Sequence, residues 1–172
     1  AEIPNPGDFK TDFIGDTPVI VVRDRDGDVN VLENRCAHRG ALVCLKEHGN
    51  ARSLNCVYHS WNYSLKGDLI GVAFERGVQG KGGMPKGFDK SQHGLRKLRV
   101  ERLSGLVFAS FSVDTPPMDE YLGPEILARV KRVTARPLKP LGTSRQYMHN
   151  NWKLYVENVK DSYHASLLHA FF

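Results

Sequence analysis

Two short stretches of the sequence decide the kind of fold, and they read RCAHRG at residues 35–40 and NCVYHSW at residues 55–61. The first stretch holds Cys36 and His38, and the second holds Cys56 and His59. Each stretch therefore supplies one thiolate and one imidazole, which are both strong ligands for transition metals. Ordinary buried cysteines and structural histidines are not expected to recur in this paired arrangement. The pattern therefore predicts a metal site.

The mixture of ligands within each stretch narrows the kind of metal site. Two cysteines and two histidines can hold a structural zinc ion in tetrahedral geometry. Zinc fingers, however, usually place both cysteines in one knuckle and both histidines in the other, whereas each stretch here holds one of each. The mixed pairing favours a Rieske [2Fe–2S] centre, in which one iron takes two thiolates and the other takes two imidazoles. A zinc-binding interaction module remains the alternative.

The residues around these stretches predict a domain rich in β-strands over about the first 115 residues. One run of β-branched residues, 18–23, leads into the hairpin dipeptide Asp26-Gly27 and a returning strand. Two more hairpins are predicted further along the chain, at residues 61–72 and 98–111. These hairpins indicate an antiparallel β domain that carries both ligand stretches.

The bulk composition limits the other function classes. The chain of 172 residues is 41% hydrophobic and 25% charged, which is typical of a globular protein. Its net charge is +5, but no nucleic-acid motif accompanies the basic residues, so nucleic-acid binding is not expected. No apolar run reaches the ~18 residues of a membrane span. The three cysteines cannot form a complete disulfide framework, which favours a reducing cytoplasm.

Two other features of the first region receive structural interpretations. The glycine-rich stretch 77–83 matches neither of the two common phosphate-binding patterns, so we interpret it as a connecting loop. Cys44 lies outside both ligand stretches and has no spare partner. We interpret it as a small buried hydrophobic residue.

The composition changes after residue 111, where a second region begins. Residues 114–117 read as a linker, and apolar residues at helical spacing predict a helix over 117–133. A further helix is predicted from Asn151 onward, and it carries the remaining candidate ligands.

Asp161, His164 and His169 form this second group of candidate metal ligands. On a helix, Asp161 and His164 share a face, whereas His164 and His169 lie roughly 140° apart around the axis. Two histidines and a carboxylate suit non-haem Fe(II), which keeps open positions for O₂ and substrate. Histidines on a helix are more often structural, so this group alone leaves both interpretations open.

Residues 150–169, NNWKLYVENVKDSYHASLLH, closely resemble the iron-binding segment of the Rieske non-haem iron oxygenases that hydroxylate aromatic rings. The pattern E-N-x-x-D-x-Y-H-x-x-x-x-H is present in full, and Trp61 also matches the family. Val57 and Ser60 stand where the family commonly has proline and glycine, and neither is a ligand. Within the family, the chain is most similar to large subunits that act on terephthalate, anthranilate and salicylate.

The resemblance implies a ligand set for each of two iron centres. At a [2Fe–2S] cluster, it pairs Cys36 with Cys56 on one iron and His38 with His59 on the other. At a mononuclear Fe(II), it names two further ligands and one residue close to the metal, namely His164, His169 and Asn158. The family's third ligand to this iron is an aspartate far downstream, which we expect beyond residue 172.

The resemblance gives Asp161 a role other than that of a ligand. The matching aspartate in the family hydrogen-bonds the first iron-binding histidine, which is His164 here. It also bonds a cluster histidine across a subunit boundary, which would be His59 of a neighbouring copy. Asp161 is therefore expected to connect the two kinds of centre.

The resemblance also implies the fold class and the activity. The expected fold is α+β, with an antiparallel β Rieske domain at 1–115 and the truncated start of a helix-grip-type catalytic domain at 116–172. The expected function is that of a terminal oxygenase, which hydroxylates an aromatic carboxylate with O₂ and electrons from NAD(P)H. The expected partners are a reductase, acting directly or through a ferredoxin, and other copies in a homotrimer or an α3β3 assembly with a small β subunit. A Rieske ferredoxin, a pure electron carrier, is the competing interpretation, because residues 1–115 alone would support it.

Overall fold

The structure is a computed structural model that describes residues 2–142, 144 and 146–169. It divides into two compact units, Ala1–Pro140 and Leu141–Phe172. Each unit is described by itself below. The domain boundary expected between residues 115 and 116 remains a prediction.

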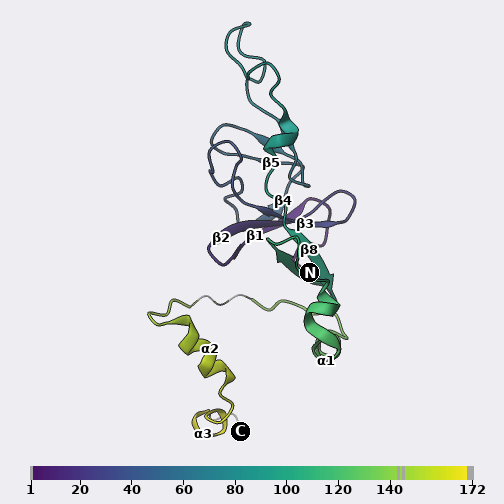
Figure 1. Ribbon diagram of the computed structural model, residues 1–172, viewed down its shortest axis with the longest axis vertical. Helices are drawn as coiled ribbons and strands as arrows, with labels where there is room; N and C mark the ends of the chain where they lie inside the picture. Colours follow the sequence, from purple (N-terminus) through teal and green to yellow (C-terminus); the bar gives the residue numbers. More distant parts are fainter. Residues whose placement is uncertain (1, 143, 145, 170–172) are drawn as a thin grey trace. The chain divides into compact units, whose positions relative to one another are not determined.

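The first unit is built around a four-stranded antiparallel sheet of order β3-β2-β1-β4 (Figure 1). Its strands are β1 (Asp8–Ile14), β2 (Thr17–Arg23), β3 (Val29–Glu33) and β4 (His48–Asn50). The predicted hairpin at 18–32 is confirmed as β2 and β3. Strand β1 was not predicted, because its sequence, DFKTDFI, mixes charged and apolar residues without a clear alternation.

Strand β2 lies at the centre of the sheet and is buried on both faces, which explains its unbroken apolar sequence. Ile20 and Val22 face the main core, which also holds both ligand cysteines, Cys36 and Cys56. Val19 faces a smaller second core on the other side of the sheet. The ligand-bearing part of the chain is therefore packed directly against the central strand.

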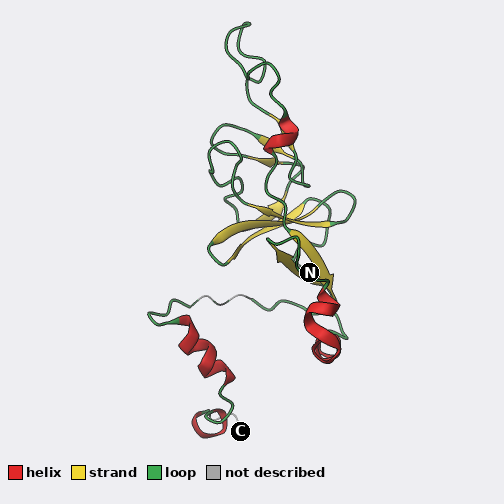
Figure 2. Ribbon diagram, viewed as in Figure 1, coloured by secondary structure: helices red, strands yellow, loops and turns green. Residues whose placement is uncertain are grey.

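The remaining strands of the first unit are short. Strands β5 (Leu54–Asn55), β6 (Asn62–Tyr63) and β7 (Leu69–Gly71) form a second antiparallel sheet, and a 3-10 helix, η1 (Lys90–His93), follows them. The predicted hairpin at 61–72 is thus present, but its strands are shorter than expected. Figure 2 shows that most of the chain around these strands is loop. Such short strands place the two ligand stretches at loop tips.

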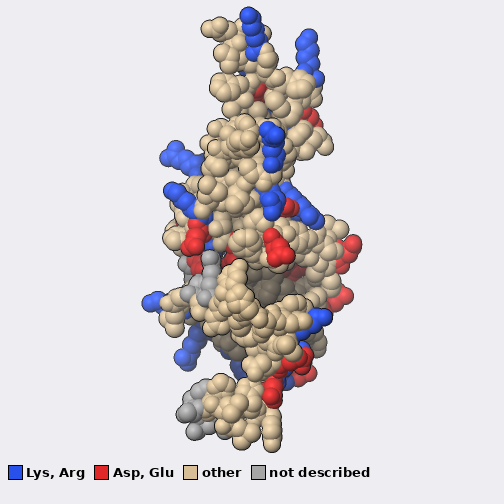
Figure 3. Space-filling view, turned by 90° about the vertical axis from the view of Figure 1, so that its left-hand side faces the viewer, with Lys and Arg blue, Asp and Glu red and all other residues tan. Residues whose placement is uncertain are grey.

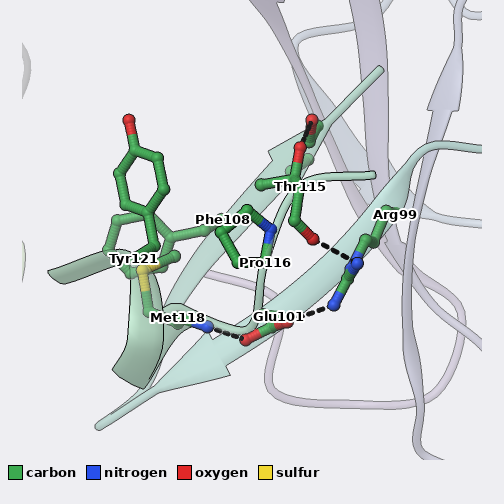
Figure 4. A pocket seen from close by; sticks show the side chains of 9 residues that line it. Arg99, Glu101, Phe108, Thr115, Pro116, Met118 and Tyr121 are labelled. Carbon is green, nitrogen blue, oxygen red and sulfur yellow. Dashed lines mark hydrogen bonds and ion pairs between the residues drawn. The ribbon is translucent and has the colours of Figure 1, made fainter. Parts of the chain in front are cut away.

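A two-stranded hairpin, β8 (Arg99–Leu103) and β9 (Leu106–Ser110), confirms the third predicted hairpin. Helix α1 (Met118–Val133) follows it, as expected from the sequence, and is interrupted at Gly123, just before Pro124. The start of α1 is fixed to the hairpin, because the backbone N–H of Met118 donates to Oε2 of Glu101 at 2.7 Å. Figure 4 shows this bond at the edge of a pocket of about 340 Å³ between β8, β9 and the start of α1.

The second unit contains α2 (Trp152–Lys160) and the short α3 (Ala165–Leu168). The expectation of one helix through residue 169 is therefore wrong. The chain leaves helical geometry at Asp161, which has φ −76° and ψ 94°, and Oδ1 of Asp161 accepts the backbone N–H of Tyr163 at 2.9 Å. Such side-chain-to-backbone bonds compete with helix formation and end α2 at this point. Among the described residues, no helix is long and apolar enough to cross a membrane.

Candidate metal centres

The two ligand stretches fold into loops with the same backbone hydrogen bonds. In the first loop, the N–H of Gly40 donates to the carbonyl of Cys36 at 2.8 Å, and the N–H of Cys36 donates to the carbonyl of Ala41 at 2.8 Å. In the second loop, Ser60 and Trp61 repeat these two bonds with Cys56, at 3.0 and 2.8 Å. The two loops are therefore matching turns that each begin at a cysteine.

The same turn explains one departure from the family's commonest sequence. Gly40 closes the first turn with φ +70°, which glycine adopts without strain. Ser60 closes the second turn with φ +54°, a conformation that is uncommon for residues other than glycine. The position where the family commonly has glycine is thus one where the turn requires positive φ, and Ser60 keeps the turn at some conformational cost.

The sulfur atoms of the two loops are buried together. Cys36 and Cys56 are 4% and 2% exposed. The hydroxyl of Tyr63 lies 3.1 Å from Sγ of Cys36 and accepts the backbone N–H of Ala37 at 3.1 Å. Burial raises the pKa of the Cys36 thiol, an effect to which the nearby Cys56 sulfur adds and which the Tyr63 hydrogen bond opposes. A bound metal cation would take the place of the thiol proton, and its positive charge would stabilise the buried thiolate.

The imidazole rings of the two loops lie side by side and are exposed. The ring centroids of His38 and His59 are 4.7 Å apart. The ring of Trp61 stacks on His38 at 4.9 Å with an interplanar angle of 13°, and Tyr58 lies against His59 at 3.9 Å. Partial burial and the neighbouring His59 and Arg39 lower the pKa of His38, which favours the neutral imidazole that binds metals.

The donor set fits a cluster with two irons better than a single ion. A Rieske [2Fe–2S] cluster requires two protein ligands for each iron, namely two thiolates for one iron and two imidazoles for the other. The structure shows the same division, because the two cysteines are buried together and the two histidines are exposed side by side.

Two residues at this site were not given a role by sequence reasoning. Tyr63 contacts Cys36 from the strand that follows the second loop, four residues past His59. Trp61 was noted only as a match to the family, and the structure shows that it stacks on His38. Cys44, expected to be buried, is only half-buried, and its Sγ lies 3.8 Å from the carbonyl of Lys46.

The second group of candidate ligands, Asp161, His164 and His169, lies in a turn and a short helix rather than on the single helix that the sequence predicted. Although Asp161 and His164 do not share a helix, Oδ2 of Asp161 lies 3.1 Å from Nδ1 of His164. The hydrogen bond with His164, together with the backbone N–H of Tyr163, lowers the pKa of Asp161. A carboxylate on Nδ1 fixes the imidazole tautomer and leaves Nε2 for a metal.

The short helix α3 separates the two histidines of this group. His164 precedes α3 and His169 follows it, and their ring centroids lie 5.4 Å apart. This arrangement replaces the expected placement of both rings on one continuous helix. Asn158 lies in the last turn of α2, and its carbonyl accepts the backbone N–H of Asp161 at 3.3 Å.

Comparison with known proteins defines the class of protein. Residues 1–80 match the family model described as the Rieske [2Fe-2S] domain. The first unit therefore contains a Rieske domain, the kind of domain that binds a [2Fe–2S] cluster.

Longer matches define the family within this class. The chain is 59% identical over 172 residues to the alpha 2 subunit of the terephthalate 1,2-dioxygenase terminal oxygenase component of Comamonas sp. It is 58% identical over 177 residues to the large oxygenase component of salicylate 5-hydroxylase from Ralstonia sp. Each match covers 100% of this chain and 42% of the relative, so the chain spans about two fifths of their length. The chain belongs to the Rieske oxygenases and matches part of their large, or alpha, subunits.

The solved structures agree with this family. The crystal structure of naphthalene 1,2-dioxygenase from Rhodococcus sp., bound to indole, matches with a TM-score of 0.83 and 31% identity. The match covers 96% of this chain and 38% of that chain. The expected α+β fold with an antiparallel Rieske domain is confirmed.

Proposed function

We propose that the two ligand loops hold the [2Fe–2S] cluster through Cys36 and Cys56 on one iron and His38 and His59 on the other. The burial of the sulfur pair and the exposure of the histidine pair support this assignment. Replacing two thiolates by neutral imidazoles removes negative charge around one iron, so the bound cluster supplies a centre that accepts one electron readily. The exposed imidazoles provide the side from which electrons can arrive and leave.

We propose further that His164 and His169 are ligands of a mononuclear Fe(II), with Asn158 close to the metal. The contact of Asp161 with Nδ1 of His164 supports this assignment, because metal-binding histidines usually give their second nitrogen to such a partner. Non-haem Fe(II) sites of this class combine two histidines with one carboxylate. Asp161 already contacts Nδ1 of His164, so we propose that a different carboxylate is the third ligand of this iron.

The whole protein is proposed to be the terminal oxygenase of a multicomponent system that hydroxylates an aromatic carboxylate. One observation carries this proposal, namely that the paired cluster loops and the D-x-Y-H-x-x-x-x-H segment occur in one chain. A Rieske electron carrier has no use for the second segment. The activities for which these relatives are named support a carboxylate substrate, since terephthalate and salicylate both carry carboxyl groups. Reducing equivalents are proposed to come from NAD(P)H through a reductase, directly or by way of a ferredoxin.

Asp161 is proposed to connect the two centres between copies of the chain. Its Oδ2 contacts His164 within its own unit, and its side chain is 51% exposed, so it remains accessible to a neighbouring copy. The exposed imidazole of His59 is the proposed partner on that copy. The assembly is proposed to be a homotrimer, alone or with a small β subunit in an α3β3 arrangement.

The test is a single-turnover assay on the protein with both centres loaded. The cluster is reduced, excess reductant is removed, and O₂ is added with terephthalate, anthranilate, salicylate or benzoate. The expected result is a dihydrodiol, catechol or phenol, formed together with oxidation of the cluster. If no candidate yields product or accelerates cluster oxidation, while the cluster still exchanges electrons with a reductase, the oxygenase proposal is wrong and the electron carrier takes its place.

A further inference from the structure

The two imidazoles of the proposed cluster site have unequal support from their neighbours. Trp61 stacks on His38 with ring centroids 4.9 Å apart and an interplanar angle of 13°, and Trp61 is only 4% exposed. The ring beside His59 is that of Tyr58, which is tilted by 41° and 59% exposed. A buried ring is held in place by the packing around it, whereas an exposed side chain changes rotamer freely. His38 therefore lies against a fixed surface, and His59 lies against a movable one.

Trp61 is itself held by two rings from a later part of the chain. The ring centroids of Phe88 and His93 each lie 5.9 Å from that of Trp61, at interplanar angles of 68° and 74°. Such edge-to-face arrangements are favourable for aromatic pairs. Phe88 and His93 also contact each other, with centroids 4.6 Å apart. We call these three residues, Trp61, Phe88 and His93, the aromatic brace.

The outer residues of the aromatic brace are fixed in turn by the chain around them. Phe88 packs against the main core, which also holds both ligand cysteines. Nδ1 of His93 lies 2.9 Å from the carbonyl oxygen of Asp89, and because a carbonyl oxygen only accepts, the ring donates this bond. Asp89 also caps η1 by accepting the backbone N–H of Ser91 at 2.9 Å. The brace is therefore part of the packed domain and is not a group of loosely held rings.

The brace gives a role to the base of the segment that joins β7 to η1. Its glycine-rich stretch, 77–83, was expected to be a connecting loop and is a loop in the structure, and Lys and Arg side chains project at its outer end (Figure 3). Below it, the backbone N–H of Met84 donates to the carbonyl of Glu75 at 2.9 Å, and Nζ of Lys90 lies 3.0 Å from Oε2 of Glu75. These two contacts close the base of the loop, so Phe88 reaches the brace from a fixed position.

We propose that Trp61 is a positioning residue that fixes the orientation of the His38 imidazole as a cluster ligand, and that the His59 imidazole is the less restrained of the two. The proposal rests on the cluster assignment made above and adds an inequality between its two imidazole ligands. A ligand holds a metal in one geometry only when its own rotamer is locked by the surrounding packing. Trp61 supplies this packing for His38, and the rest of the brace supplies it for Trp61.

The competing interpretation is that Trp61 only fills the core. Loss of a large core side chain leaves a cavity and lowers stability wherever it occurs, so it would loosen both imidazoles alike. Leu69 belongs to the same core but lies on β7, outside both ligand loops, and is 5% exposed. Leu69→Ala is therefore a matched control for a general loss of packing. Positioning by Trp61 differs from it because only one imidazole is affected.

The test is electron–nuclear double resonance of the reduced, cluster-loaded protein, which measures the nitrogen hyperfine coupling of each imidazole ligand. The proteins compared are wild type, Trp61→Leu, Trp61→Phe and Leu69→Ala. Trp61→Leu removes the stacked ring, and Trp61→Phe keeps a smaller ring at the same place. The rate at which cluster iron is lost to a chelator is followed in parallel.

In Trp61→Leu, one of the two nitrogen couplings should broaden, because the released imidazole takes up several orientations, while the other coupling keeps its width. Iron should be lost about tenfold faster, which is the effect expected when the support of a metal ligand is removed. Trp61→Phe should largely restore both readouts. Leu69→Ala should show two sharp couplings and a rate of iron loss close to that of wild type.

Two sharp couplings in Trp61→Leu would overturn the proposal. Equal broadening of both couplings, or the same broadening in Leu69→Ala, would overturn it in favour of core packing alone. If Trp61→Leu does not fold, Phe88→Leu takes its place, since it removes one support of Trp61 and should broaden one coupling to a smaller extent. Unchanged couplings in Phe88→Leu would then count against the brace. A wild-type protein that holds no cluster would instead refute the cluster assignment.

Discussion

The hydroxyl of Tyr63 lies 3.1 Å from Sγ of Cys36, in a site where Tyr63 is fully buried. The same hydroxyl accepts the backbone N–H of Ala37, so its proton is available for the sulfur. A hydrogen bond to a ligand sulfur stabilises the more negative, reduced form of an iron–sulfur cluster. We therefore expect Tyr63 to tune the potential of the proposed cluster without binding it.

Replacing Tyr63 by phenylalanine should lower the reduction potential of the cluster. If the bond is stronger in the reduced form by an amount similar to the net worth of a hydrogen bond, about 0.5–1.5 kcal/mol, the shift is roughly 20–60 mV for a one-electron couple. A spectroelectrochemical titration measures this shift. Tyr58→Phe serves as the control, because Tyr58 contacts the ring of His59 rather than a sulfur. An unchanged potential in Tyr63→Phe would show that the hydroxyl does not bond the cluster sulfur.

A pair of glycine variants separates close packing from backbone strain. Gly67 and Gly27 have φ of +86° and +93°, so alanine is strained at both positions, by about 1–2 kcal/mol. At Gly67, a Cβ would lie 2.8 Å from Cδ2 of the buried Leu32, whereas nothing lies within 4 Å at Gly27. Gly67→Ala should therefore lower the free energy of unfolding by an additional ~1–3 kcal/mol. Urea denaturation provides the comparison, and equal losses would contradict the packing argument.

Asp24 is a buried carboxylate in the turn between β2 and β3. Its Oδ1 accepts the backbone N–H groups of Asp26 and Asp28, and its Oδ2 accepts from Asn30, each at 3.0 Å. Burial alone would raise the pKa of Asp24, but these bonds and the nearby Lys66 hold it below its usual value. The stabilisation by this carboxylate is therefore complete above the unfolded-state pKa of about 4, and it is lost as the pH falls through the lower folded-state pKa.

Asp24→Asn should remove that contribution. At pH 7, the variant is expected to lose about 1–3 kcal/mol of the free energy of unfolding, because the amide turns a donor toward Asn30 and Lys66. The gap between wild type and variant should narrow below pH 4, where the wild-type carboxylate becomes protonated. Unfolding curves from pH 7 to pH 3 test this expectation. A gap that stays constant with pH would mean that the charge of Asp24 does not stabilise the turn.

Asp161→Asn tests the support of the proposed mononuclear iron site. The amide cannot accept the Nδ1 proton of His164 with the strength of a carboxylate, so iron affinity should fall about tenfold or more. Competition with a chelator of known affinity measures the change. Asp114→Asn, at an exposed position in the predicted linker, is the matched control. Equal iron retention in both variants would leave Asp161 without a role at the metal.

The sequence predicted the features that depend on local patterns. The hairpin at 18–32 follows from a β-branched run and an Asp-Gly turn, and the ligand spacing predicted the two loops that lie together at the proposed cluster site. Strand β1 could not be found in this way, because only pairing with β2 and β4 makes it a strand. Strands of two or three residues, such as β5 and β6, are too short to show an alternating pattern.

The contacts that complete the two sites depend on tertiary structure. The bond from Tyr63 to Cys36 joins residues 27 positions apart, and no spacing rule indicates it. The end of α2 at Asp161 was missed because the helical spacing continues past it, although the side chain of Asp161 bonds the backbone of Tyr163 instead. The Asp161–His164 pair was still predicted, since residues three apart can meet in a tight turn as well as on a helix.

The central claim is that Cys36, His38, Cys56 and His59 hold a Rieske [2Fe–2S] cluster. The most direct measurement is the EPR spectrum of the reduced protein, together with iron and acid-labile sulfide analysis, for wild type, His59→Ala and Cys44→Ala. Wild type and Cys44→Ala should show the signal of a mixed His/Cys cluster with two sulfides per cluster, and His59→Ala should lose it. A colourless wild-type protein that binds zinc, or a His59→Ala variant with an unchanged spectrum, would contradict the account.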